Sequence, residues 1–382
     1  MRRRLLLTLV LPALLAGCST VSGWFSSGPK PLPPAPLVNF KPSADLIHAF
    51  SVDAGSPGFH RLQPAAAHGV LYVAGERGRV QAYGVLDSKR LWQSNIGTGI
   101  VAGVGAGEGL VVVGAAQAGV VALSASNGAK VWAMTLTSDV TGAPLVADGI
   151  VLVRTSDGSI YGLSAKDGKQ QWLYTRQLPS LMLQGAGGMS VRDGVLYAGY
   201  PGGRLVALSV ANGAQLWDAT VAVPHGATEL ERLTDVVGPP AVNATQVCAV
   251  AYQGRVACFD RTSGNLLWAR DTSSETGLAM DGANVYVTDI SDTVTAYAAG
   301  SGRIVWKQDA LARRGVSAPL AYAATVVVGD NQGYVHVLSA QDGSFLARQQ
   351  AAGGAVISRP VDIGPGIAVE TAKGEVTAYR LK

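Results

Sequence analysis

Six tryptophans recur along the chain at a nearly constant interval, and each one ends a similar short phrase. They are Trp92, Trp132, Trp172, Trp217, Trp268 and Trp306, so the steps between them are 40, 40, 45, 51 and 38 residues. The phrase reads GSIYGLSAKDGKQQW at 158–172 and GRLVALSVANGAQLW at 203–217. Self-similarity at such a period indicates a repeat architecture. Function is therefore expected where the repeat is interrupted.

Each repeat combines turn signals with short apolar runs. Within residues 144–172, Asp-Gly pairs stand at 148–149, 157–158 and 167–168. Glycine accepts a positive φ at a tight turn, and the Val-, Ile- and Leu-rich runs between the pairs favour strands. One repeat thus predicts four short antiparallel strands, the size of a propeller blade. A closed ring of blades buries both faces of each sheet.

The repeat count predicts eight blades. A seventh copy at 333–347 has Ala347 where Trp is expected, and an eighth begins at Gly374 but ends at Lys382 before its last strand. Residues 44–53 supply a strand that can complete it, which removes both open edges. The predicted fold class is all-β: an eight-bladed β-propeller of four-stranded antiparallel blades over residues 44–382, closed by an N-terminal strand. The repeat tryptophans are expected to pack between blades rather than to contact a ligand.

The N-terminus predicts a lipoprotein. Residues 1–17 read as a signal peptide, with arginines followed by an apolar run that is too short to span a membrane. Residues 15–18 (LAGC) look like a bacterial lipobox, which makes Cys18 the predicted lipid attachment site; an ordinary secretory signal is the alternative. Residues 18–43 form the lipidated cysteine and a Ser/Gly/Pro tether. Since Ser19 rather than Asp follows the cysteine, bacterial sorting rules favour the periplasmic face of the outer membrane.

Charge and motifs exclude several function classes. The formal net charge of +4 falls to +1 when the three arginines of the signal peptide are removed, and no basic stripe supports nucleic-acid binding. The sequence contains no nucleophile elbow, phosphate loop or dinucleotide fingerprint, and its five histidines are scattered. We therefore predict no catalytic residue, no cofactor and no metal site.

Two cysteines remain in the predicted propeller. Cys248 and Cys258 flank a turn and are expected to lie nearly opposite each other on neighbouring strands. An oxidising periplasm would permit a disulfide. Buried free thiols that behave as small apolar side chains are the favoured interpretation.

The two longest intervals follow Trp172 and Trp217, where extra residues fall at 178–186 and 223–240. Both insertions follow the last strand of consecutive blades, so we expect them side by side on one face of the ring. Long connections often carry binding residues. Leu181 to Leu183 would form an apolar centre, and Glu229, Glu231, Arg232 and Asp235 a charged rim. The alternative is that the two loops simply pack on themselves.

The lipobox, the repeats and the loop at 229–235 (ELERLTD) together resemble the BamB family of the outer-membrane β-barrel assembly machinery. The resemblance covers the mature chain. It implies a non-catalytic scaffold that binds a periplasmic domain of the barrel-forming subunit and helps deliver unfolded outer-membrane proteins. It also implies partner contact at matching positions here, with Gln184 in place of the usual Arg and Val237 in place of a second Asp. The predicted partner-binding residues are Leu181, Leu183, Gln184, Glu229, Glu231, Arg232, Asp235 and Val237.

Two other functions fit a propeller of this kind. A polysaccharide- or peptidoglycan-binding propeller lipoprotein shares the fold and the anchor. A quinone-dependent dehydrogenase shares the repeat. A resemblance to those enzymes, however, would imply a longer chain, an adjacent cysteine pair and a calcium-binding carboxylate site. This chain has no adjacent cysteine pair.

Overall fold

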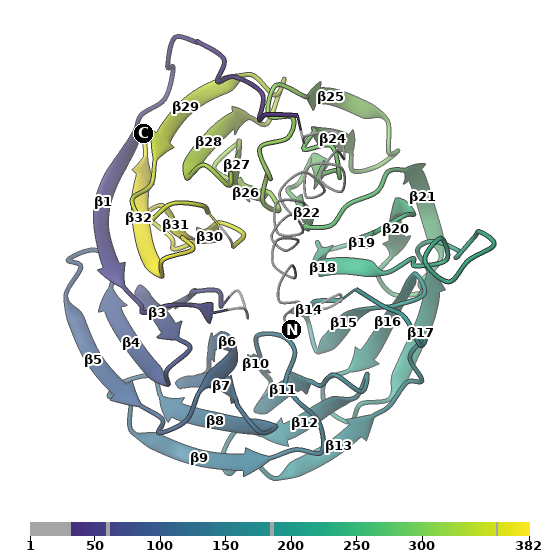
Figure 1. Cartoon of the computed structure of the whole chain (residues 1–382). Helices are drawn as coiled ribbons and strands as arrows, with labels where there is room; N and C mark the ends of the chain where they lie inside the picture. The colour runs from purple at the N-terminus through teal and green to yellow at the C-terminus, as the bar shows by residue number, and fades with distance from the viewer. Residues whose placement is uncertain (1–31, 59–61, 184–186, 357) are drawn as a thin grey trace, which may run out of the picture. The chain divides into compact units, whose positions relative to one another are not determined.

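The computed structural model describes residues 32–58, 62–183, 187–356 and 358–382. Its regular elements in these ranges are β-strands, and they form eight four-stranded sheets. No helix within these ranges has the length and apolar character needed to cross a bilayer. Residues 35–382 form one compact unit. Figure 1 shows the sheets arranged as blades around a central axis.

Each blade is described from its innermost strand outward. Blade one is β2 (Ala65–Ala67), β3 (Val70–Gly75), β4 (Arg79–Gly84) and β5 (Arg90–Asn95). Blade two is β6 (Ile100–Gly107), β7 (Leu110–Ala115), β8 (Gly119–Ser124) and β9 (Lys130–Thr135). Blade three is β10 (Leu145–Ala147), β11 (Ile150–Arg154), β12 (Ile160–Ser164) and β13 (Gln170–Tyr174). Blade four is β14 (Met189–Arg192), β15 (Val195–Tyr200), β16 (Arg204–Ser209) and β17 (Gln215–Thr220).

The second half of the ring repeats the same order. Blade five is β18 (Val236–Val242), β19 (Gln246–Ala251), β20 (Arg255–Asp260) and β21 (Leu266–Asp271). Blade six is β22 (Gly277–Met280), β23 (Asn284–Thr288), β24 (Val294–Ala298) and β25 (Ile304–Gln308). Blade seven is β26 (Leu320–Tyr322), β27 (Thr325–Gly329), β28 (Tyr334–Ser339) and β29 (Phe345–Gln350). Blade eight is β30 (Val361–Asp362), β31 (Ile367–Glu370), β32 (Glu375–Leu381) and β1 (Leu46–Asp53).

Blade eight joins the two ends of the propeller. β1 pairs antiparallel with β32, from Leu46 opposite Leu381 to Asp53 opposite Glu375. The N-terminal strand therefore completes the last blade, and the predicted closure of the ring is confirmed. Figure 1 shows β1 as the outer strand beside the yellow C-terminal strand.

The repeat tryptophans link neighbouring blades. Each indole N–H donates a hydrogen bond to a backbone carbonyl of the next blade, as from Trp92 to Ala125 at 2.8 Å and from Trp172 to Val210 at 2.8 Å. A β-bulge recurs beside each of them, where the opposing residue is small. In blade seven the bulge persists, but Ala347 lies opposite Val337, so the larger side chain has moved to the other strand. The predicted packing role of the tryptophans is confirmed.

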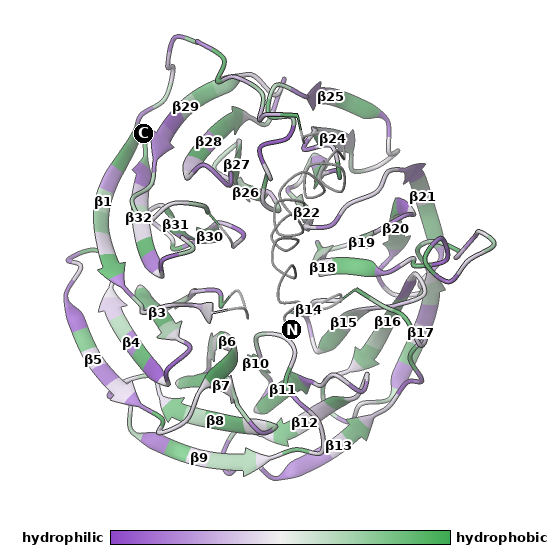
Figure 2. Ribbon diagram, viewed as in Figure 1, coloured by the Kyte–Doolittle hydropathy of each residue, from purple (hydrophilic) through white to green (hydrophobic). Residues whose placement is uncertain are grey.

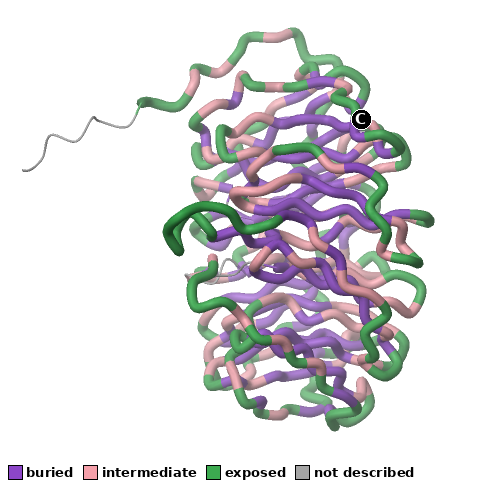
Figure 3. Tube along the Cα trace, turned by 90° about the vertical axis from the view of Figure 1, so that its right-hand side faces the viewer, coloured by how far each residue is buried: buried purple, intermediate pink, exposed green. Residues whose placement is uncertain are grey.

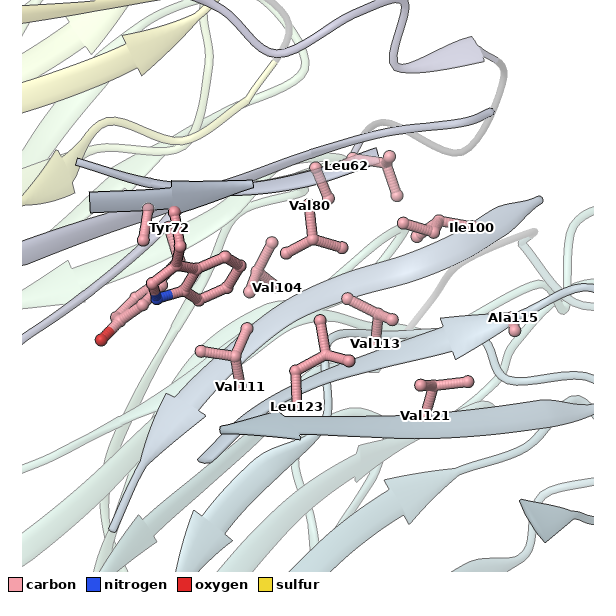
Figure 4. Close-up of a cluster of buried hydrophobic side chains, with 13 residues drawn as sticks. Leu62, Tyr72, Val80, Ile100, Val104, Val111, Val113, Ala115, Val121 and Leu123 are labelled. Carbon is pink, nitrogen blue, oxygen red and sulfur yellow. The ribbon is translucent and has the colours of Figure 1, made fainter. Parts of the chain in front are cut away.

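The core lies between the blades. Figure 4 shows one such layer, in which apolar side chains of blade one, including Tyr72 and Val80, meet those of blade two, including Val111 and Leu123. The second and third strands of a blade are buried on both faces, as in β7, whereas the outer strand β9 buries only a minority of its residues. Figure 2 shows the same contrast as green inner strands and mixed outer strands. Sheets buried on both faces are expected to read as apolar runs.

Cys248 and Cys258 form a disulfide. They are directly opposite each other on β19 and β20, with their Cα atoms 4.0 Å apart, and both are fully buried. The preference for free thiols was therefore wrong. Ten residues of sequence separation leave both states open, and it is the strand register that brings the two sulfur atoms within bonding range.

Candidate partner-binding site

The predicted insertions at 178–186 and 223–240 fall in the connections at 175–188, between β13 and β14, and at 221–235, between β17 and β18; residues 236–240 of the second already belong to β18. We call them loop A and loop B. Each runs from the outer strand of one blade to the inner strand of the next, so both leave the ring on the same face. Figure 1 shows loop B reaching the rim beside β21, and Figure 3 shows its exposed course. The expectation that the two insertions share a face is confirmed.

Asp235, at the end of loop B, joins the two loops. Its Oδ2 accepts a hydrogen bond from the Leu183 N–H at 2.6 Å, and its Oδ1 accepts one from the Gly202 N–H at 3.1 Å. Its backbone pairs with Pro201 in an isolated bridge. The residue is only 1% exposed. The carboxylate is thus an internal link between loop A and loop B, not part of a charged rim.

Burial raises the pKa of Asp235, and the hydrogen bonds from Leu183 and Gly202 only partly offset this. A buried carboxylate is costly unless its oxygens are satisfied. Here two backbone N–H groups supply that stabilisation. One side chain of loop B thus helps to hold loop A in place.

Arg154, at the end of β11, supports the other end of loop A. Its guanidinium donates hydrogen bonds to the carbonyl oxygens of Gly187, at 2.6 Å, and Gly199. It also lies 4.3 Å from the ring centroid of Tyr200, a favourable cation–π distance. The residue is buried, which lowers the pKa of its guanidinium. Nothing in the sequence pattern indicates this role, because the acceptors are main-chain carbonyls.

The tip of loop A presents apolar side chains to solvent. Leu181 is 41% exposed and Met182 is 37% exposed. Leu183 instead packs in part against the core of blade five and lines a central cavity together with Val237. Leu181 and Met182 therefore form the accessible apolar part of loop A, while Leu183 fixes the loop to the ring.

Loop B holds its shape through its own polar groups. The Glu231 carboxylate accepts hydrogen bonds from the N–H groups of Ala227 and Thr228, and the Thr228 hydroxyl accepts one from the Glu231 N–H. This reciprocal pattern matches a capping box. The backbone N–H groups of Thr228 and Ala227 hold the pKa of Glu231 below its usual value. Glu231 thus organises the loop while remaining at the surface.

Other side chains of loop B are accessible to a partner, although Arg232 Nε also donates to the Gly226 carbonyl at 2.9 Å. Glu229 and Arg232 are exposed, with 4.0 Å between the Glu229 carboxylate and the Arg232 guanidinium. Leu230, between them, is 67% exposed, and so is Val223 at the start of the loop. These two apolar residues were not predicted as contacts, although an exposed leucine inside a charged loop is a usable sequence signal.

A cavity of about 450 Å³ is lined by Leu183 of loop A and, for the most part, by residues of blades five to eight. Leu183, Val237 and Leu278 contribute apolar surface to it, while Arg359 and Glu275 contribute charge.

Among the described residues no cluster of three or more His, Cys, Asp or Glu side chains is placed to hold a metal ion.

The structure thus divides the predicted site residues. Leu181, Glu229, Glu231 and Arg232 are exposed on the loops, whereas Asp235 and Val237 are buried and Leu183 is half-buried. Gln184 and the predicted lipid attachment site Cys18 lie outside the described residues.

Comparison with known proteins assigns the chain to a family. A family model described as outer membrane protein assembly factor BamB matches residues 76–308 and 290–382. The chain is 43% identical to the BamB of Pseudomonas aeruginosa over 373 residues, which is 97% of this chain and 98% of the relative. It is 37% identical to the BamB of Bordetella pertussis over 374 residues, covering 97% and 96% of the two chains.

Solved structures agree with this assignment. The crystal structure of BamB from Moraxella catarrhalis superimposes with a TM-score of 0.80 at 27% identity, over 88% of this chain and 100% of the other. A quinohemoprotein alcohol dehydrogenase from Comamonas testosteroni shares the fold alone, with a TM-score of 0.69 at 14% identity over 88% of this chain and 76% of the other. The chain belongs to the BamB family of outer-membrane protein assembly factors.

Proposed function

We propose that this assembly factor acts by docking the barrel-forming subunit of the outer-membrane assembly machinery through loops A and B. As a BamB-family member it is a non-catalytic accessory protein of that machinery. The finer proposal is that loops A and B together bind a periplasmic domain of the subunit. Unfolded outer-membrane proteins would be handed on through this complex, while the protein stays anchored at the periplasmic face of the outer membrane by lipid on Cys18.

The observation that carries the proposal is the link between Leu183 and Asp235. It joins the end of loop B to loop A, two long connections that the propeller itself does not need, and each loop exposes apolar side chains. Interfaces commonly combine an apolar centre with a polar rim. Leu181 and Met182 of loop A would supply the centre, and Glu229, Leu230 and Arg232 of loop B would supply the surrounding rim.

The test is binding of the mature protein to the purified periplasmic region of the barrel-forming subunit. A Leu181→Asp, Met182→Asp variant should weaken the dissociation constant by at least tenfold, because it places charge in the apolar centre. The matched control is Leu86→Asp, since Leu86 is 76% exposed on a turn at the opposite face of the ring. Equal binding by both variants and the unmodified protein would contradict the docking site.

Anchoring is tested separately. Cys18→Ser should no longer incorporate labelled palmitate and should no longer be recovered in the membrane fraction. Its fold and its binding to the subunit should persist. Retained palmitate in that variant would contradict lipid attachment at Cys18.

A further inference from the structure

Residues 35–43 form a segment, here called the strap, that lies along blade seven before β1 begins. The Ala35 N–H donates to the Ala312 carbonyl at 3.0 Å, and at the other end the Ser43 N–H donates to the Leu346 carbonyl at 3.0 Å. Figure 1 shows this part of the chain, in dark purple, passing β29 on its way to β1. Both ends of the strap are thus hydrogen-bonded to the ring.

Two arginines of the ring reach the strap's main chain. Arg314 donates to the Ala35 carbonyl at 2.9 Å, and Arg348 donates to the Val38 carbonyl at 3.0 Å. These contacts recognise backbone rather than side chains. They fix the path of the strap at two points, three residues apart.

An aromatic stack holds the strap between these points and β1. The rings of Phe40 and Phe345 are stacked with their centroids 5.4 Å apart. The Arg348 guanidinium lies 5.0 Å from the Phe40 centroid and 5.2 Å from that of Phe345. One cation therefore contacts both rings and the strap backbone at once.

The two arginines are oriented by a buried acid and a buried histidine. Asp330 Oδ2 accepts from Arg314 Nε at 2.7 Å and from His336 Nε2 at 3.0 Å. Arg348 Nε donates to His336 Nδ1 at 3.2 Å. Asp330 and His336 are fully buried, and Arg314 is 2% exposed. Since buried ion pairs are weak stabilisers of a fold, such a network suggests a role beyond packing.

Blade seven differs from the other copies at these positions. The cross-strand pair beside the tryptophan position is His336–Arg348 here, whereas it is Gln81–Gln93 in blade one, Val121–Ala133 in blade two and Thr295–Lys307 in blade six. Phe345 stands where blade two has Lys130, and blade seven is also the copy that has Ala347 in place of Trp. The departures from the repeat thus gather at the strap's contacts.

We infer that blade seven is a binding site for the chain's own N-terminal segment. We call this contact between blade seven and the strap the clamp, and we infer that it determines whether the face that carries loops A and B is turned toward the membrane. The inference rests on the proposed lipid anchor at Cys18. Ala35 leaves the ring beside Ala312, in the connection from β25 to β26. That connection is of the same type as loops A and B, so it lies on the same face.

The clamp also shortens the stretch of chain between the lipid anchor and the ring. From Cys18 to Ala35 the chain has 17 residues, against 26 to Ala44 where the predicted propeller starts. A fully extended chain covers about 3.5 Å per residue, so the maximum reach falls from about 90 Å to about 60 Å. The docking face is thereby kept at higher effective concentration near a partner in the same membrane.

The first experiment tests the clamp itself, on lipidated full-length mature protein in vesicles. Hydrogen exchange at the amides of Ala35 and Ser43 should be at least tenfold slower in the unmodified protein than in Phe40→Ser. Val38→Ser is the matched control, because the Val38 side chain is exposed and the substitution keeps the carbonyl that accepts from Arg348. Unprotected amides in the unmodified protein, or protection that survives Phe40→Ser, would overturn the clamp.

The second experiment tests orientation by energy transfer to labelled lipid headgroups. A fluorophore on Thr98→Cys reports the loop face of blade two, and one on Ser126→Cys reports the opposite face. Transfer should be stronger from the Thr98→Cys label, and Phe40→Ser should reduce that difference by half or more. Equal transfer from both labels in the otherwise unmodified protein would overturn the inference.

Failure of the docking proposal and failure of the orientation proposal can be distinguished by experiment. Phe40→Ser should bind the barrel-forming subunit normally in detergent solution, because loops A and B are untouched. Loss of that binding in the Leu181→Asp, Met182→Asp variant concerns docking alone, whereas absence of lipid on Cys18 would remove the anchor on which the orientation depends.

Discussion

The Leu183 backbone N–H donates to the Asp235 carboxylate at 2.6 Å, across 52 residues of chain. The bond joins loop A to loop B at the boundary between blades four and five. It fixes loop A to the end of loop B, where loop B enters blade five. The same carboxylate also holds Gly202, so removal of one side chain releases two backbone donors.

We therefore expect Asp235→Ala to destabilise the protein and to weaken binding of the barrel-forming subunit. A buried backbone donor left without an acceptor costs about 1–3 kcal/mol, and two are left here. Asp235→Asn should be intermediate, because its amide keeps one acceptor oxygen. Urea unfolding gives the loss of stability, and Glu229→Ala, at an exposed position, is the control. An Asp235→Ala variant that unfolds like the unmodified protein would exclude the linking role.

Glycine packing against the tryptophans gives a second prediction. Gly213 has φ = +70°, and a Cβ added there would lie 2.5 Å from the Trp172 ring. Gly149 has φ = +75°, and nothing lies within 4 Å of its added Cβ. Alanine at either site carries the left-handed penalty of about 1–2 kcal/mol. Gly213→Ala should lose a further amount of about 1–3 kcal/mol from overpacking.

The comparison is made by urea unfolding of Gly213→Ala and Gly149→Ala side by side. The shared backbone strain cancels, so the difference reports the contact between blades. Indistinguishable midpoints would mean that the tryptophan side chain moves aside without cost.

The disulfide predicts a dependence of stability on reductant. Cys248 and Cys258 close a short loop, for which the chain-entropy account gives about 3 kcal/mol. Reduction should lower the free energy of unfolding by up to that amount, and the unfolding of a Cys248→Ala, Cys258→Ala variant should be insensitive to reductant. If reductant has no effect on the unmodified protein under unfolding conditions, the bond contributes nothing to its stability.

The fold was predictable because its signal is repeated. Each of the six tryptophans marks the same place in a blade, so errors in one copy are corrected by the others. Even the departures were interpretable: Ala347 still marks blade seven, and the short end at Lys382 indicated a strand supplied by residues 44–53. The pairing of β1 with β32 confirms that inference.

The site was predictable only in part, since each loop residue occurs once. The sequence located both insertions, but a carboxylate in a polar loop reads as surface, and Asp235 is buried. Its burial depends on the N–H groups of Leu183 and Gly202, whose positions only the assembled ring defines. Arg154 escaped notice for the same reason. The sequence likewise assigned residues 35–43 to the tether, and their contacts with Arg314 and Arg348 arise from residues about 300 positions away.

The buried His336 predicts how stability depends on pH. Burial lowers the pKa of His336, and its contact with Asp330 only partly opposes this. Burial alone would raise the pKa of Asp330, but hydrogen bonds from His336, the Tyr334 N–H and Arg314 outweigh it, so the pKa lies below its usual value. In the folded protein the histidine is therefore neutral beside an ionised aspartate, and protonating its Nδ1 would remove the acceptor for Arg348.

The direction in which stability changes with pH follows from the difference in proton binding between the folded and unfolded states. In the unfolded chain the histidine takes up a proton near pH 6.5, whereas the folded protein resists it. Stability is thus fully present above about pH 6.5 and is lost as the pH falls toward the lower folded value, with a limiting slope of about 1.4 kcal/mol per pH unit. His336→Gln should reduce this slope. Urea unfolding of the unmodified protein and of His336→Gln from pH 5 to pH 8 measures the slope, and an unaltered slope in the variant would show that other groups control the acid sensitivity.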